Sequence, residues 1–115
     1  MRLLLPLRLV DAVFRLPWIL RPQFLTRCVQ DTPSSNELLP GMLFCEVRGG
    51  HMKWAHLHCP LCDDHIQLPL AGKERWLLKV DALRRPTLSP SIWEIQGCGA
   101  HFFIQKGQIL WCKDN

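Results

Sequence analysis

The sequence predicts a small, mainly β domain with antiparallel strands, and three observations support this fold class. The chain has 115 residues, which is enough for one domain. From Met42 onward, short segments alternate apolar and polar residues between glycines, prolines and other turn residues. Two pairs of residues of metal-binding types, Cys59 with Cys62 and Cys98 with His101, share the same spacing. A domain this small often needs a metal ion or a disulfide for stability.

The composition is that of a globular protein. Hydrophobic residues make up 48% of the chain and charged residues 21%, which argues against disorder. The net charge is +4, and the basic residues are spread from Arg2 to Lys113. A nucleic-acid-binding protein usually concentrates its basic residues, so the charge pattern gives such a function little support.

Residues 1–26 form a predicted N-terminal segment with a short helix. Its apolar residues fall near helical spacing, namely Leu9, Val13, Leu16 and Leu20. Pro17 would kink or end this helix. We expect the helix to pack on the domain, and a partner-binding or membrane-surface helix is the alternative.

No signal peptide or membrane span is expected. Arg8 and Asp11 interrupt the N-terminal apolar run, and no Ala-x-Ala cleavage site follows. No stretch approaches the ~20 uncharged apolar residues that a membrane span needs. The cysteine spacing is typical of a metal site rather than of a disulfide framework, which favours a reducing, cytoplasmic location.

Residues 27–115 form the predicted β domain. Residues 31–41 have the proline, serine and asparagine content of a loop. The expected strands before the C-terminal hairpin are Met42–Val47, His51–His58, His65–Leu70, Arg75–Val80 and Ser91–Ile95.

The clearest element is a C-terminal hairpin of His101–Gln105 and Gln108–Cys112. Lys106 and Gly107 form its two-residue turn, with glycine where a positive φ is needed. The register places Phe102, Ile104, Ile109 and Trp111 on one face. It places His101, Phe103, Leu110 and Cys112 on the other.

The two matched pairs predict one structural zinc ion bound by Cys59, Cys62, Cys98 and His101. A Cys-x-x-Cys loop directs two sulfurs to one ion, and histidine in the last position of the second pair suits zinc and not a disulfide. Each pair lies between two expected strands, so each is expected at a hairpin tip. Two such tips that bind one ion form a zinc ribbon.

Other assignments of these residues stay open. His58 and Cys112 are alternate ligands or contacts of a ligand, since one adjoins Cys59 and the other lies opposite His101 in the hairpin. A redox-active cysteine pair and unliganded core thiols are less favoured. Cys28 and Cys45 are expected to be small buried residues.

The sequence lacks the usual enzyme motifs. It has no His-x-Glu of a zinc deaminase and no His-Glu-x-x-His of a metalloprotease. Ser89-Pro90-Ser91 is predicted to be a turn, without the Gly-x-Ser-x-Gly of many serine hydrolases. Four protein ligands would also leave zinc no open position for catalysis.

The C-terminal three quarters of the chain resembles a known bacterial family. The motifs are RPTLSPSIW (Arg85–Trp93), GCGAHFFI (Gly97–Ile104), Gly107, ILWC (Ile109–Cys112) and HLHCPLC (His56–Cys62). They closely resemble domain-of-unknown-function family 6527 over about residues 27–112. One departure is that Asp63 and Asp64 follow the second cysteine where that family has glycine.

This resemblance implies a role beside ubiquitin-like conjugation. Members of the family are encoded beside ubiquitin-like modifiers, E1-like activating enzymes, E2-like proteins and JAB-type peptidases. We therefore expect a non-catalytic, zinc-stabilised module that binds a ubiquitin-like modifier or its E1, E2 or JAB-type machinery. A nucleic-acid-binding zinc ribbon that uses Trp54, Trp76 and Trp93 is the first alternative. A zinc-dependent or thiol-dependent enzyme is the second.

Overall fold

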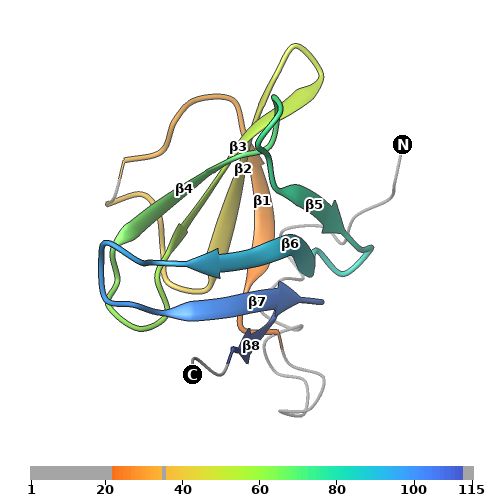
Figure 1. Cartoon of the computed structure of the whole chain (residues 1–115). Coiled ribbons are helices and arrows are strands. Elements are labelled where there is room, and N and C mark those ends of the chain that lie inside the picture. Colours follow the sequence, from red (N-terminus) through yellow and green to blue (C-terminus); the bar gives the residue numbers. More distant parts are fainter. Residues whose placement is uncertain (1–21, 35, 113–115) are drawn as a thin grey trace.

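The computed structural model describes residues 22–34 and 36–112, which form eight β-strands and no helix (Figure 1). The first sheet has the order β1-β2-β3-β4 and consists of β1 (Leu25–Val29), β2 (Met42–Arg48), β3 (His51–His58) and β4 (His65–Pro69). The second sheet has the order β5-β6-β7-β8 and consists of β5 (Leu77–Val80), β6 (Pro86–Trp93), β7 (His101–Gln105) and β8 (Gln108–Trp111). The mainly β prediction is confirmed.

The core lies between the two sheets, and both contribute alternate residues to it. In Figure 1, β6 and β7 run across the strands of the first sheet. Leu43, Ala55 and Leu57 from the first sheet belong to one buried cluster with residues of the second. Phe102 and Ile104 are the second sheet's most buried members in β7. Because side chains alternate along a strand, His101 and Phe103 lie on the opposite, outer face of the second sheet.

The prediction of purely antiparallel strands is wrong at β1. This strand pairs with β2 in parallel, with Leu25 opposite Met42 and Val29 opposite Glu46. The predicted boundary after residue 26 placed Leu25 and Thr26 in the N-terminal extension. Residues 30–41 then supply the crossover of about a dozen residues that a parallel pair requires.

The predicted N-terminal helix falls almost entirely outside the described residues. Within the part that the structure describes, residues 22–24 lead into β1 and pack on the turn of the C-terminal hairpin. The backbone N–H groups of Gln23 and Phe24 both donate to the carbonyl of Gly107, at 2.7 and 2.9 Å. None of the described residues forms a helix that is long and apolar enough to cross a membrane.

The C-terminal hairpin is confirmed in register and turn, and its second strand ends one residue earlier than predicted, at Trp111. Phe102 pairs with Trp111 and Phe103 with Leu110, so the two faces are those predicted. Lys106 and Gly107 have φ values of +48° and +78°. Both residues are therefore left-handed, as in a type I′ turn.

Candidate functional site

Three of the four predicted zinc ligands lie together between the sheets. The sulfur atoms of Cys59, Cys62 and Cys98 all lie within 4.8 Å of one another. The Cys59 and Cys98 sulfurs are 3.6 Å apart. Residues that are 39 positions apart in the sequence thus form one cluster that can hold a metal ion.

The first two sulfurs are positioned by a tight turn between β3 and β4. The N–H of Cys59 donates to the carbonyl of Asp64 at 2.8 Å, and the N–H of Asp63 donates to the carbonyl of Cys59 at 2.9 Å. Asp63 has a φ of +64°. Aspartate tolerates this left-handed conformation better than most residues, so the turn closes without the expected glycine.

The third sulfur lies in the loop that joins β6 to β7. The carbonyl of Glu94 accepts hydrogen bonds from the N–H groups of Gly97 and Gly99, at 3.1 and 2.8 Å. Gly99 has a φ of +81°, which glycine adopts without strain. The N–H of Ala100 donates to the Cys98 sulfur and lowers the pKa of this thiol. The loop therefore favours the thiolate that binds metals.

The geometry and chemistry of the cluster fit zinc. Zinc–sulfur bonds of about 2.3 Å in a tetrahedron place two sulfurs about 3.8 Å apart. The separation of 3.6 Å between Cys59 and Cys98 is close to this value. The three thiols would supply three of the four ligands of a structural zinc site.

The fourth predicted ligand, His101, lies outside this group of sulfurs. Its Nε2 atom is 2.9 Å from the Oγ atom of Ser91. The two other candidates are also elsewhere. His58 has its Nδ1 atom 2.8 Å from the carbonyl oxygen of Asp63. Cys112 donates its backbone N–H to the carbonyl of His101 at 2.9 Å.

A bulge in β6 brings Ser91 to His101. Leu88 pairs with Ile104 and Ile92 pairs with Phe102, so Ser89–Ser91 on β6 lie opposite a single residue of β7. The peptide bond between Ser89 and Pro90 is cis. A bulge re-aims the side chains of its strand, and here it directs the Ser91 hydroxyl to the imidazole.

Two tryptophans support the pair. Trp93 stacks on His101, with ring centroids 4.7 Å apart and an angle of 10° between the planes. The Nε1–H of Trp76 donates to the carbonyl of Ser91 at 3.3 Å. One tryptophan thus fixes the plane of the imidazole, and the other fixes the backbone of the serine. Ser91 and His101 are both partly exposed on the outer face, where a substrate can reach them.

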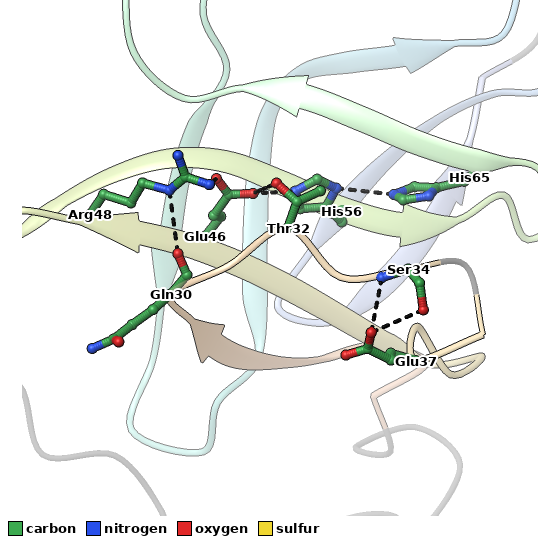
Figure 2. Close-up of polar contacts among 8 residues, drawn as sticks. All are labelled: Gln30, Thr32, Ser34, Glu37, Glu46, Arg48, His56 and His65. Atoms are coloured by element: carbon green, nitrogen blue, oxygen red, sulfur yellow. Dashed lines mark hydrogen bonds and ion pairs between the residues drawn. The ribbon is translucent and has the colours of Figure 1, made fainter.

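A buried polar network in the first sheet was not predicted from the sequence. Glu46 and His56 are 1% and 0% exposed, with Glu46 Oε1 3.0 Å from His56 Nε2. Figure 2 shows a line of polar contacts that runs from Arg48 through this pair to His65. The hydroxyl of Thr32 also donates to Glu46 at 2.9 Å. These residues come from β2, β3, β4 and the segment after β1, so the network joins the first sheet across its strands.

Burial and hydrogen bonding act on Glu46 in opposite directions. Burial raises the pKa of the Glu46 carboxyl, but the hydrogen bonds from His56 and Thr32 and the charge of Arg48 together lower it below its usual range. Burial also lowers the pKa of His65, and the nearby His56 adds to this effect. The network therefore favours an ionised glutamate and a neutral His65.

A further hollow lies where β1 and β2 end, away from the cysteine cluster and from the Ser91–His101 pair. It measures about 870 Å³ and is lined by Cys28–Asp31 and Val47–Gly50. Cys28 is exposed at its wall, so the prediction that Cys28 is buried is wrong, whereas Cys45 is buried as expected. The strand register explains this difference, because Cys28 lies near the end of an edge strand and Cys45 in the interior of the sheet.

The comparison with protein families decides between a binding module and an enzyme. A family model described as bacterial ubiquitination-like system serine protease (BubE) matches residues 28–112. The chain belongs to this family. No curated protein and no solved structure shows a significant match to this chain.

The family corrects one expectation and supports another. The prediction of a non-catalytic module is wrong, because the family is one of serine proteases. The association with a bacterial ubiquitination-like system is confirmed. The error arose at Ser89-Pro90-Ser91, where the sequence lacks the local motif of many serine hydrolases. Ser91 and His101, which the structure brings together, lie on different strands, and the sequence signal that could have joined them is that both lie in motifs of the family resemblance.

Proposed function

We propose that the chain is a serine protease in which Ser91 is the nucleophile and His101 is the general base. The observation that carries this proposal is the distance of 2.9 Å between Ser91 Oγ and His101 Nε2. A serine hydroxyl is a weak nucleophile until a base within hydrogen-bond distance accepts its proton. The chain belongs to a family of serine proteases, and a serine protease needs a serine with a base that accepts its proton. The Ser91–His101 pair is partly exposed on the second sheet, where it can serve this role.

The proposed reaction is acyl transfer through an acyl-enzyme. Ser91 Oγ attacks the carbonyl carbon of the substrate while its proton passes to His101 Nε2. The imidazolium then donates this proton to the leaving nitrogen, the carbon–nitrogen bond breaks, and an ester to Ser91 remains. His101 next accepts a proton from water, whose oxygen attacks the ester carbon. The imidazolium then returns this proton to Ser91 Oγ as the ester bond breaks, which releases the carboxylic acid and the free serine.

The family context points to the substrate class. In ubiquitin-like conjugation, the carboxyl end of a modifier is joined to an amine, so the modifier is the acyl part of any bond that a protease in such a system cleaves. We therefore propose that the enzyme cleaves amide bonds that follow the carboxyl end of a ubiquitin-like modifier, either in its precursor or in a conjugate.

A zinc ion bound by Cys59, Cys62 and Cys98 would have a structural role in this enzyme. Cys98 lies in the loop that connects the strand of Ser91 to the strand of His101. An ion at the three sulfurs would tie this loop to the β3–β4 turn of the other sheet. In this assignment, His101 pairs with Ser91 and is not a ligand of the metal ion.

Labelling with a fluorophosphonate tests the proposal. Such a probe phosphonylates an activated serine and releases fluoride, and mass spectrometry of the digested protein then identifies the labelled residue. We expect labelling at Ser91, its loss in Ser91→Ala, and a decrease of about 10²-fold or more in its rate in His101→Gln. Ser34→Ala, which changes an exposed serine in the segment after β1, is the control that should label normally. Labelling that persists unchanged in Ser91→Ala would refute the assignment.

A further inference from the structure

The outer face of the second sheet carries an exposed apolar pair beside the proposed catalytic residues. Phe103 on β7 and Leu110 on β8 are register partners, so their side chains project on the same side of the sheet. They are 42% and 45% exposed. His101 projects on this side as well, because it is two residues from Phe103 on the same strand.

A hollow of about 360 Å³ lies at this pair. It is lined by Thr87–Ser89 of β6, Phe103–Gln105 of β7 and Leu110 of β8. No residue of this lining carries a formal charge, and Phe103 and Leu110 are the large apolar side chains that it exposes on the outer face. A concave, mainly apolar surface with a few neutral polar groups is the usual form of a site that holds an uncharged side chain.

The hollow and the Ser91–His101 pair originate in the same irregularity of β6. The bulge residues Ser89–Ser91 lie opposite Phe103. Ser89 lines the hollow, and Ser91, two residues later, contacts His101. Along β7, Phe103 is two residues from His101, a distance of roughly 7 Å in an extended strand. Alternate side chains of an extended peptide have the same spacing, so a peptide bound at Ser91 can place a nearby side chain in the hollow.

We propose that this hollow is the specificity subsite of the protease and that it holds one apolar side chain of the modifier's tail, within about three residues of the cleaved bond on its acyl side. This inference rests on the proposed roles of Ser91 and His101. The occupant is uncharged because burial of an unpaired charge against Phe103 and Leu110 would be unfavourable. The occupant belongs to the acyl side because the modifier is the part that is common to all substrates of such an enzyme.

The subsite has a measurable consequence for selectivity. A single methylene in an apolar subsite changes the specificity constant by about 10- to 200-fold. Truncation of a wall residue should therefore reduce the preference for apolar substrates by about tenfold or more, without loss of the reaction at Ser91 itself. Phe103 and Leu110 are suitable for truncation because their exposure makes a change in the fold small.

The test uses two fluorophosphonate probes with the same reactive group. One carries an alkyl chain on phosphorus, in the position of the acyl part of a substrate, and the other carries a polyether chain of equal length. The rate constants for labelling of Ser91 are measured for the full-length protein and for Phe103→Ala and Leu110→Ala. Met52→Ala is the matched control, because Met52 is 42% exposed but lies on β3 of the other sheet.

We expect the alkyl probe to label the wild-type protein at least about tenfold faster than the polyether probe does. This preference should decrease in both wall variants and stay unchanged in Met52→Ala. Labelling of Ser91 at equal rates by the two probes would refute the subsite and leave the proposed function intact. A preference that survives in both wall variants would also refute it. No labelling of Ser91 by either probe would refute the proposed function itself.

Discussion

The Cys59 sulfur lies 3.6 Å from the Cys98 sulfur, and this contact connects the two sheets beside the proposed active site. Cys59 follows β3 of the first sheet directly. Cys98 lies in the loop between β6, which carries Ser91, and β7, which carries His101. A metal ion at these sulfurs would fix the loop on which the relative position of the two proposed catalytic residues depends.

The first prediction concerns this metal. We expect purified protein to contain about one zinc per chain, and Cys98→Ser to lose most of it. Structural zinc typically contributes about 10–16 kcal/mol of apparent binding free energy, so the variant should unfold at a lower temperature or fail to fold. The zinc content, measured by elemental analysis, should decrease together with the melting temperature and the rate of Ser91 labelling. Cys112→Ser, which removes a thiol outside the cluster, is the control. Full zinc content in Cys98→Ser would show that Cys98 is not a ligand.

The second prediction concerns the turn of the C-terminal hairpin. Gly107 has a φ of +78°, and a Cβ atom there would lie 2.6 Å from Pro22 Cβ and 2.7 Å from the Phe24 carbonyl oxygen. Gly107→Ala should therefore combine left-handed strain of about 1–2 kcal/mol with a steric clash. Gly50 has a similar φ of +77° with no atom within 4 Å of a Cβ atom, so Gly50→Ala measures the strain alone.

Urea unfolding of both variants separates the two effects. We expect Gly107→Ala to lose more free energy of unfolding than Gly50→Ala, by about 1–3 kcal/mol, which is the usual cost of overpacking. Equal losses would mean that residues 22–24 do not pack against the turn as the structure describes.

The sequence predicted the features that depend on neighbouring residues. The hairpin of β7 and β8 follows from alternation on both sides of a Lys-Gly turn, and the cysteine cluster follows from the spacing of Cys59 and Cys62. The Ser91–His101 pair depends instead on a bulge and on pairing between two strands. No local pattern specifies that register, and the same histidine also fits the spacing of a zinc ligand.

The Glu46–His56 pair was beyond local prediction for a related reason. Its partners are 10 residues apart on neighbouring strands, and the pair is buried only because Thr32 and His65 satisfy its remaining polar groups. A buried polar pair cannot be recognised before the partners of both groups are known. An isolated glutamate in a strand pattern is more often exposed.

The third prediction concerns this buried pair. Glu46→Leu and His56→Leu should each destabilise the protein by about 3–5 kcal/mol, because each leaves one polar partner buried without its counterpart. The double variant should lose less than the sum of the two single losses, since neither group is then left alone. Chemical unfolding of the three variants measures the coupling. Additive losses would show that the two side chains do not interact in solution.

The last prediction is a dependence of stability on pH that His65 controls. Burial, together with the nearby His56 and His58, lowers the pKa of His65 below its ordinary value of 6.5. The folded state therefore binds a proton at His65 less readily than the unfolded state. The stability that neutral His65 contributes is fully present above about pH 6.5 and is lost as the pH falls through the lower folded-state pKa.

Thermal melting between pH 7.5 and pH 5 measures this effect. We expect the melting temperature of the wild-type protein to decrease over this range, and the decrease to be smaller in His65→Gln, which has no group to protonate at this position. His51→Gln is the matched control, because His51 is exposed at the end of β3 that lies far from His65. This variant should retain the wild-type profile. The contribution of all other titrating groups is common to the three proteins and cancels in the comparison. If His65→Gln and the wild-type protein gave parallel profiles, the titration of His65 would not be linked to folding, and its buried contact with His56 would be wrong.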